Sequence, residues 1–538
     1  MAEAIGQKGL FVRNATGLVR EVSPLNAYII NFIVSHPVLP IAAGLFFAFS
    51  AFPGGNFVVA GLLSIPIILS FTYSFGLLTS IIPRTGGDYT LVSRILHPAL
   101  GLISSFCMTA AQLMSAAFFG RLVVIVGLGP GLVGIGLVSN NPGLVDAGNT
   151  VATSPFWTFV VGSLLYLSAA GILFGGWRWT LRWQNVLFLL VSAGFLLSVV
   201  IALFTSHDSF VSNFNQFAGP YTNNPDTYNL VIANAQEAGI TMQPGFSLSN
   251  TIPVIGIFAT FSIFTYFSSF LGGELRQGRS TKTAHVMAIA GVTGLLSIVI
   301  CAYIFVNTFG ADFLTAAFSS SGMPSQIATS PTYFFLIAAS ANNALLAWVL
   351  VITFMLFWPL LTYVVFIQPG RMLFAYAFDG ILPAAVTKLS KSHTPWVAVL
   401  LTVLATEAIF AWSLTSDWIF RIVVYLTLIQ LIAMGLVGVA AMTVPWRRPD
   451  LYRASSSQRT FLGLPVISIA GAGALVSAIF IWVLYFAYPG FGLSDSLGLW
   501  IWVIALVLGA VLFYIGARVV RRRQGVDLDL VYREIPPE

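Results

Sequence analysis

The chain has 538 residues, of which 57% are hydrophobic and only 8% are Asp, Glu, Lys or Arg. Soluble domains carry far more charge on their surfaces, so this composition excludes an ordinary soluble protein. The net charge of +6 would favour nucleic acid as a partner of a soluble chain. Here we interpret it as basic residues that face anionic lipid headgroups, with the lipid bilayer and no nucleic acid as the partner.

The apolar residues form about twelve runs, each close to the ~20 residues that a helix needs to cross a bilayer. In chain order, the expected membrane helices cover 26–51, 57–82, 98–126, 154–175, 184–206, 251–273, 284–308, 332–368, 396–414, 417–444, 465–488 and 497–519. The run 332–368 is long for one span, so we expect it to start outside the membrane or to tilt. The longer polar stretches 127–153, 207–250 and 309–331 are interpreted as outside loops.

Charge is distributed unevenly between the segments that join these runs. With the N-terminus in the cytoplasm, all but two of the 24 Lys and Arg residues fall on cytoplasmic segments or helix ends. The outside segments carry acids instead: Asp146, Asp208, Asp226, Glu237, Asp312, Asp417 and Asp495. The positive-inside rule therefore predicts a multi-pass cell-membrane protein with both termini in the cytoplasm. We expect residues 1–25 and 520–538 to be cytoplasmic extensions. Cys107 and Cys301 fall inside expected helices, and we expect neither a disulfide framework, a metal site nor a cofactor.

The first run is interrupted near its middle, where residues 35–40 read SHPVLP. Each of the two prolines, Pro37 and Pro40, removes a backbone donor and clashes with the preceding turn, so the helix should break here. Freed backbone groups in hydrocarbon are tolerated where they line a cavity or meet a ligand, which makes the break a pointer to a binding site. An ordinary proline kink satisfied by neighbouring helices is the alternative.

Three motifs lie at ends of the expected helices. Residues 82–89 read IPRTGGDY, residues 272–276 read GGELR, and residues 370–383 read GRMLFAYAFDGILP. In order and spacing these segments resemble the amino acid–polyamine–organocation (APC) superfamily of permeases, whose second and eighth helices end in P-x-x-G-G-x-Y and S-R-x-x-x-x-x-A-x-D-G-x-x-P. Glu274 resembles the acidic residue that follows the sixth helix of that family. The resemblance covers residues 26 to about 443.

This resemblance implies an all-α membrane protein with the leucine-transporter-type fold (LeuT fold). Helices one to five and six to ten would form a 5+5 inverted repeat over 26–443, with helices one and six broken at the bilayer midplane. Two additional C-terminal helices would occupy 444–519. The family's substrate site would lie between helices one, three, six, eight and ten, and its activity is secondary transport by alternating access, with no chemical step and therefore no enzyme.

The chain also departs from the family pattern. The family carries Gly-Ser-Gly in the break of helix one, where this chain has the proline-containing segment from Ser35 onward. The break of helix six, 261–267, reads FSIFTYF and lacks the family's glycines. Many members place an acid in helix two near Leu77, and this chain does not. These differences put a standard α-amino-acid pose in doubt without affecting the expected fold.

Candidate substrate-binding residues lie around the two expected breaks. Asn31 and Ser35 share one face of the first helix and either contact substrate or make interhelical and capping hydrogen bonds. His36 is the histidine placed well inside a span, where it either binds substrate or a proton, or is a neutral core histidine. Pro37 is a further candidate from the first break. The helix-six candidates are the aromatic and hydroxyl residues Phe261, Phe264, Thr265 and Tyr266, for which packing is the alternative role.

A second group is expected to act in coupling or gating, together with His36. Arg121, Glu407 and Arg421 are charges inside apolar runs, where an unpaired charge costs several kcal/mol, so we expect pairing or an aqueous cavity. A salt bridge between Glu407 and Arg421 is the favoured interpretation, with Arg121 facing an outer vestibule. Thr362 matches a position that binds Na⁺ in sodium-coupled relatives, but its neighbours are a poor oxygen set. Coupling to protons, or exchange, is therefore favoured over Na⁺.

The sequence thus predicts a secondary transporter or exchanger whose small-molecule substrate is an amino acid. A permease for polyamines or other organic cations is the alternative within the same fold. A membrane enzyme would need clustered catalytic or metal-ligating groups within the spans, and a channel would need a continuous polar pore; neither pattern is visible in the sequence.

Overall fold

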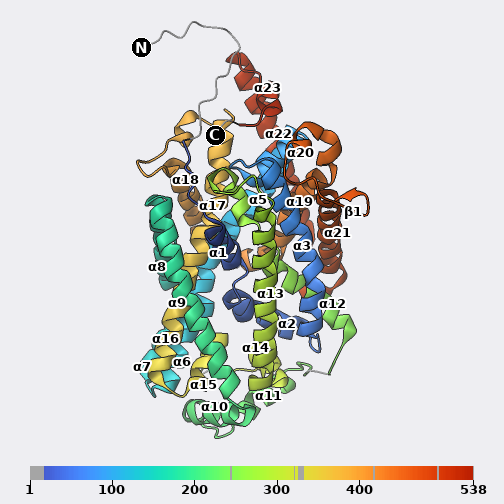
Figure 1. The fold of residues 1–538 in the computed structure, drawn as a ribbon. Helices are drawn as coiled ribbons and strands as arrows, with labels where there is room; N and C mark the ends of the chain where they lie inside the picture. The colour runs from blue at the N-terminus through green and yellow to red at the C-terminus, as the bar shows by residue number, and fades with distance from the viewer. Residues whose placement is uncertain are drawn as a thin grey trace.

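The computed structural model describes residues 17–242, 245–319, 321–324, 327, 332–415, 418–493 and 496–536. Most elements are helices that run roughly along one axis and form an elongated bundle (Figure 1). The strands among the described residues are the two-residue β1 (Thr460–Phe461) and β2 (Leu464–Pro465), which form a small antiparallel hairpin. The all-α fold class is therefore confirmed.

Eleven described stretches are long and apolar enough to cross a membrane, in addition to the shorter apolar helices at the start of the chain. The main helices in these stretches are α3 (Phe57–Ile81), α5 (Pro98–Leu122, whose stretch continues to Val138), α8 (Pro155–Phe174), α9 (Trp177–Phe204), α12 (Leu248–Ser262), α13 (Lys282–Phe309), α16 (Ala344–Met355), α17 (Phe357–Phe378), α18 (Trp396–Ser413), α19 (Trp418–Arg447), α21 (Val466–Ala487) and α22 (Leu497–Arg523). The protein is a multi-pass membrane protein. The number of spans and the inverted repeat stay predictions.

The first expected span is broken where its prolines predict. Helix α1 (Pro24–Val34) ends before Ser35, and the chain resumes as a π-helical turn, η1 (Pro40–Gly44), followed by α2 (Leu45–Ala51). Pro37 and Pro40 have no backbone N–H, so a continuous α-helical ladder cannot pass through them.

The sixth expected span is broken as well. Helix α12 ends at Ser262, residues 263–266 form turns, and the chain continues as the short 3₁₀ segments η3 (Phe267–Phe270) and η4 (Gly272–Glu274). This break contains neither glycine nor proline, so tertiary contacts stabilise it. Both predicted helix breaks are confirmed.

Helices form within each of the three segments interpreted as outside loops. These segments contain α6 (Gly129–Val138), α7 (Pro142–Thr153), α10 (His207–Thr222), α11 (Thr227–Glu237) and α14 (Ala311–Phe318). Asn141, Ser206 and Asp226 cap three of these helices by accepting backbone N–H bonds. Buried aromatic contacts fix two of them to each other, as in the stack of Tyr228 on Phe313 with ring centroids 4.5 Å apart.

The long run 332–368 is divided rather than simply tilted. It begins as α15 (Tyr333–Ala341) and restarts as α16 and α17. The division falls at Asn342, which adopts a left-handed conformation with φ 45°, and at Asn343, whose side chain caps α16. Both roles are ones that asparagine performs well.

Both described chain ends lie at one end of the bundle, which we call the terminal face. It carries residues 17–23, α4 (Gly87–Ile95), α20 (Pro449–Arg453) and α23 (Leu528–Arg533) (Figure 1). The opposite end, with α10, α11 and α14, is called the far face. The stretch 520–538 includes the end of α22 and all of α23, whose Leu528 and Tyr532 are buried. Within the described part of this stretch, 520–536, α23 therefore packs against the bundle.

Candidate functional site

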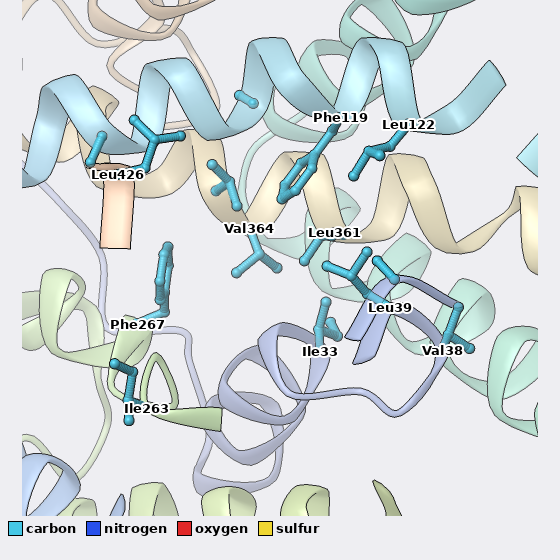
Figure 2. Packing of buried hydrophobic residues seen from close by; sticks show 14 of the residues in the cluster. Ile33, Val38, Leu39, Phe119, Leu122, Ile263, Phe267, Leu361, Val364 and Leu426 are labelled. Carbon is cyan, nitrogen blue, oxygen red and sulfur yellow. The ribbon is translucent and has the colours of Figure 1, made fainter. Parts of the chain in front are cut away.

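A cavity of about 160 Å³ lies in the middle of the bundle, beside both helix breaks. Its walls come from five parts of the chain: the first broken helix, α5, the broken α12 segment, α17 and α19. Figure 2 shows Leu39, Phe119, Leu361 and Leu426 converging on this region from four of them. This is the set of helices predicted to enclose the substrate, namely helices one, three, six, eight and ten.

Most of the cavity wall is aromatic or aliphatic. The apolar residues are Val34, Leu39, Ala43, Phe47, Phe118, Phe119, Leu122, Phe261, Phe264, Phe267, Leu361, Val365 and Leu426. The polar residues are Gln112, Ser115, Thr260, Thr427 and Gln430. Of the residues predicted to bind substrate, Phe261 and Phe264 line this cavity; Phe261 lies in the last turn of α12 and Phe264 in the break that follows it.

Asn31 joins the two broken helices rather than lining the cavity. Its side-chain amide donates to Ser268 Oγ at 2.9 Å, and its carbonyl oxygen accepts from the Ser268 backbone N–H at 2.9 Å. Both residues are fully buried. Asn31 therefore supplies a hydrogen-bond partner for backbone in the irregular segment after α12, and this contact holds the two breaks together.

His36 sits in an aromatic surround on the side of α9 and α17. Its ring lies 5.5–5.7 Å, centroid to centroid, from Phe32, Phe195 and Phe357. Its Nε2 is 3.3 Å from Ser192 Oγ on α9, and its Nδ1 accepts from the Val38 backbone N–H at 3.4 Å. The second bond satisfies a backbone donor freed by the break. His36 is not among the described residues that line the central cavity.

Ser35 and Thr265 both face α13. Methyl groups at Gly294 and Gly291 of α13 would overlap the side chains of Ser35 and Thr265, respectively, so the breaks pack tightly on this helix. The Ser35 hydroxyl donates to the Phe32 carbonyl at 3.3 Å, which keeps it within its own turn. The Pro37 carbonyl accepts from the Ile41 N–H at 2.9 Å and starts the helix after the break.

Tyr266 is buried on the terminal-face side of the cavity. Its ring stacks on Phe75 of α3 with centroids 3.8 Å apart and an interplanar angle of 10°. Its hydroxyl lies 3.7 Å from Met108 Sδ on α5. The contacts place Tyr266 between α3 and α5, where it packs against Phe267, a residue that lines the cavity.

The expected coupling and gating residues are separated in the structure. Arg121 donates to the Ser413 carbonyl at 2.9 Å, which links α5 to the end of α18. Glu407 accepts a hydrogen bond from Ser163 of α8. The side chain of Arg421 lies outside the described residues, so the expected salt bridge with Glu407 stays a prediction. Thr362 is fully buried on α17, and its hydroxyl has no hydrogen-bond partner in the part of the chain that the structure describes.

The terminal face is closed by a buried ion pair beneath the broken α12 segment. Glu274 receives two hydrogen bonds from the Arg371 guanidinium, at 2.7 Å and 2.9 Å, and one from the Trp177 indole. Glu274 is fully buried, and the bidentate geometry satisfies both of its oxygens. The acidic residue noted in the sequence thus ties the segment after α12 to α9 and α17.

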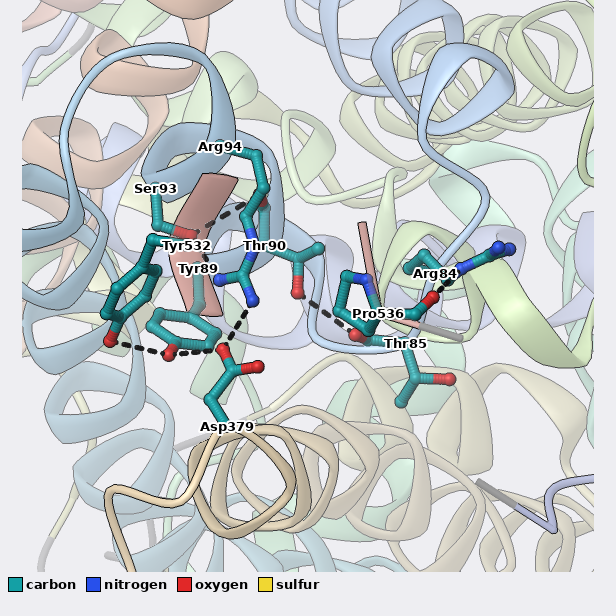
Figure 3. Close-up of polar contacts among 9 residues, drawn as sticks. All are labelled: Arg84, Thr85, Tyr89, Thr90, Ser93, Arg94, Asp379, Tyr532 and Pro536. Carbon is teal, nitrogen blue, oxygen red and sulfur yellow. Dashed lines mark hydrogen bonds and ion pairs between the residues drawn. The ribbon is translucent and has the colours of Figure 1, made fainter. Parts of the chain in front are cut away.

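A second ion pair ties α4 to the end of α17. Arg94 contacts Asp379 at 2.6 Å, and the Tyr89 hydroxyl donates to the same carboxylate oxygen at 2.7 Å (Figure 3). Arg94 and Asp379 are both at least 96% buried. Tyr89 belongs to the motif at 82–89 and Asp379 to the motif at 370–383, while Arg94 lies farther along α4. Both motifs therefore contribute to the closed terminal face.

The opposite direction is less obstructed. A smaller cavity of about 90 Å³ shares Phe47, Thr260, Phe261 and Thr427 with the central one and continues between α2 and α21 to Gly490. A wider depression of about 270 Å³ opens at the far face beside Tyr303, and neither helix break lines it. The central cavity therefore lies on a route that leads toward the far face.

Sequence reasoning missed all five polar residues of the cavity, among them the glutamines Gln112 of α5 and Gln430 of α19. Both glutamines are buried, and they line the cavity from two helices that pack against each other. A polar residue inside an apolar run is the signal that could have found them, but many buried polar residues in this chain only bond the preceding turn, as Thr72 and Thr79 do. Position in the bundle, not residue type, distinguishes the glutamines.

Comparison with known proteins gives one positive finding. Residues 23–513 match the family model described as amino acid permease. A search of curated protein sequences found no significant match. The matched region includes both helix breaks, every residue that lines the central cavity and both ion pairs of the terminal face.

Proposed function

The chain belongs to the amino acid permease family of the APC superfamily, and on that premise we propose that it carries amino acids across the cell membrane by alternating access. It is a transporter with a small-molecule substrate rather than an enzyme. The observation that carries the mechanism is the central cavity, which both broken helices border and which α5, α17 and α19 complete. A site shared by two discontinuous helices is how this class of transporter exposes one substrate to either side in turn.

The closed terminal face and the route toward the far face support a conformation in which substrate enters from the far side. The ion pairs Glu274–Arg371 and Arg94–Asp379 would have to separate, or move as units, for release at the terminal face. In this proposal, the inverted repeat of helices one to five and six to ten gives rise to two conformations, each open to one side of the membrane. We propose that the terminal face is cytoplasmic, which the excess of basic residues on those segments supports.

For coupling, we propose protons, or exchange of one substrate for another, ahead of Na⁺. His36 is the titratable group at the helix-one break, and its contacts to Ser192 and to the Val38 amide connect α9 with that break. Thr362 offers one hydroxyl to a cation and lacks the additional oxygen ligands on its own helix that Na⁺ prefers, since its neighbours are Leu361 and Tyr363.

Uptake into proteoliposomes tests this function. The purified protein is reconstituted and supplied with radiolabelled amino acids, polyamines and nucleobases, with pH and Na⁺ gradients imposed separately. Uptake or counterflow of at least one amino acid, driven by a pH gradient or by internal substrate, is expected. Transport of amines or nucleobases but of no amino acid would overturn the proposed substrate while leaving the fold intact.

A further inference from the structure

The central cavity has an unusual balance of groups: its described lining contains no Asp, Glu, Lys, Arg or His. Ten of its lining residues are phenylalanine or leucine, among them Phe118 of α5, Phe264 of the break after α12 and Leu361 of α17. A charged side chain of a substrate would lose its hydration there and meet no counter-charge. An uncharged apolar side chain would instead gain from leaving water.

Gln430 is a polar residue of this cavity whose side-chain oxygen has unmet bonding capacity; that atom is itself almost without exposed surface, so the amide must turn toward the cavity to meet a ligand. The residue lies on α19, is 97% buried, and its Oε1 accepts no hydrogen bond from any residue that the structure describes. Gln112 faces the same space from α5, and the contact of its Nε2 is the weakly accepting Met108 sulfur at 3.9 Å. A buried carbonyl oxygen without a donor is costly, so it marks a place where a ligand donor binds.

We propose that Gln430 accepts a hydrogen bond from the amino group of the substrate, and that the substrate is an amino acid with an uncharged, apolar side chain. This inference rests on the proposed function and deepens it. The ammonium group would meet the carbonyl dipole of Gln430 rather than a carboxylate. Such a site holds a zwitterion, whose own charges neutralise each other, better than a net cation.

The test measures binding and exchange for leucine, phenylalanine, lysine and putrescine, using thermal stabilisation in detergent and competition in proteoliposomes. Wild type should bind leucine or phenylalanine at least tenfold more tightly than lysine or putrescine. The Gln430→Leu variant should weaken leucine binding at least tenfold, which corresponds to about 1.4 kcal/mol. The Gln430→Glu variant adds a carboxylate to the cavity and should raise the affinity for lysine and putrescine.

Gln368 offers a matched control. It is a fully buried glutamine on α17 whose Oε1 also has no partner among the described residues, but it does not line the cavity. Gln368→Leu and Gln368→Glu should leave the order of affinities unchanged. Unchanged leucine affinity in folded Gln430→Leu, or equal wild-type affinity for lysine and leucine, would overturn this inference alone. If wild type binds none of the amino acids, the proposed function fails as well.

A separate observation concerns the C-terminal segment, which crosses the closed terminal face. The Tyr532 hydroxyl of α23 lies 3.0 Å from the Tyr89 hydroxyl, and the Tyr532 ring centroid is 4.9 Å from the Arg94 guanidinium carbon. Farther along, the Pro536 carbonyl accepts from Arg84 Nε at 2.5 Å. Figure 3 shows Tyr532, Tyr89 and Arg94 close to Asp379, with Pro536 and Arg84 paired to one side, so the segment contacts groups that pair α4 with α17.

The segment also reaches the other partner of that pair. Arg521, at the end of α22, donates to the backbone carbonyl of Gly380, directly after Asp379. Leu528 and Tyr532 are at most 4% exposed, so α23 packs closely against the helix bundle. The chain from Arg521 to Pro536 therefore bridges α4 and the end of α17, and its contacts add to those that hold the two elements together.

We infer that residues 521–536 form a strap that holds the terminal face closed and limits the rate at which it opens. Deletion of residues 525–538, or the single change Tyr532→Ala, should raise the maximal rate of leucine exchange severalfold without changing its KM. Leu530→Ala on the same helix, at a side chain that is 54% exposed, should leave the rate unchanged.

A thiol probe reports opening without relying on transport. Thr85 is buried beside Pro536 at the terminal face, and a Thr85→Cys variant should react with maleimide faster when Tyr532→Ala is added. The two native thiols, Cys107 and Cys301, are buried. Equal labelling and exchange rates with and without Tyr532→Ala, in protein of unchanged melting temperature, would overturn the strap.

Discussion

Asn31 shows how much one buried amide determines in this molecule. It makes two hydrogen bonds to Ser268 and so joins α1 to the irregular segment after α12. We predict that Asn31→Leu lowers the free energy of unfolding by about 1–3 kcal/mol, because the Ser268 amide and hydroxyl lose their partner in a buried site. Thermal unfolding in detergent measures this loss. Asn229→Leu on α11, whose amide bonds the exposed Asp226, is the control, and an equal effect of both changes would contradict the prediction.

A substitution at His36 distinguishes a role in proton coupling from a role in packing. The ring is enclosed by phenylalanines of α1, α9 and α17, so His36→Phe should keep the ring packing while it removes the hydrogen bond from the Val38 N–H. If the imidazole carries a coupled proton, this variant should lose most pH-driven uptake and show a flat pH profile between about pH 5 and 8. Uptake normalised to folded protein at two pH values measures the effect. A wild-type pH profile in the variant would remove His36 from coupling.

Asp88 gives the terminal face a pH dependence of stability. Its carboxylate is buried and accepts from Ser104 at 2.7 Å, and the titratable groups that face it are Cys107, Tyr266 and Tyr376. Burial raises the pKa of Asp88 from 3.8 to about 7, with the bond from Ser104 acting in the opposite direction.

The sign of that effect follows from proton binding. Between the unfolded and folded pKa values the folded protein binds the proton more tightly, so stability falls as the pH rises from about 4 to about 7. We predict that the melting temperature decreases from pH 5 to pH 8 and that Asp88→Asn makes this decrease smaller. Asp208→Asn, at the exposed start of α10, is the control. Identical slopes in wild type and Asp88→Asn would exclude Asp88 as the cause.

The candidate site was only partly predictable from individual residues. Phe261 and Phe264 were predicted and line the cavity, and Asn31 was predicted with interhelical bonding as one of its two roles. The sequence does not indicate that His36 points toward α9 while Leu39, three residues later, points into the cavity, because the break interrupts the helical periodicity on which such an assignment depends. Gln430 was missed because only the packing of α19 against α5 places it at the cavity.

At the scale of elements, the two breaks differ in how they could be foreseen. Pro37 and Pro40 predict the first break from the sequence alone. The second was expected from family resemblance and depends on contacts from Asn31 and from α13. The helices of the outside segments are not indicated by hydropathy, because α10 and α11 are polar and gain stability from caps and from buried aromatic contacts with α14, not from a long apolar run.

Close packing of α3 on α13 is a second element-level feature with a test. Gly76 lies directly against Ala284, and a methyl group at Gly76 would overlap the backbone of that residue. Small residues at such contacts let membrane helices approach closely. We predict that Gly76→Ala destabilises the protein by about 1–3 kcal/mol, measured as a lower melting temperature. Gly171→Ala in α8, where the added methyl meets open space, should be neutral or slightly stabilising. Equal melting temperatures for the two variants would contradict this packing role.

At the scale of the whole molecule, charge and architecture agree. The terminal face carries α20, α23 and the end of α22, with Arg448, Arg453 and Arg521–Arg523 among its residues. The far face carries acids in its helices, including Asp208 at the start of α10 and Asp312 at the start of α14. Because basic segments are retained on the cytoplasmic side during insertion, this polarity predicts that the terminal face is cytoplasmic.

Two introduced cysteines decide that orientation. Asn223 lies between α10 and α11 at the far face, and Ala454 is exposed just after α20 at the terminal face. A membrane-impermeant maleimide applied to intact cells should label Asn223→Cys and leave Ala454→Cys unlabelled, and permeabilisation should make both reactive. The opposite pattern would invert the molecule in the membrane. Inversion would also turn the central cavity's route at Gly490 toward the cytoplasm, so the same experiment determines the side from which the observed conformation receives substrate.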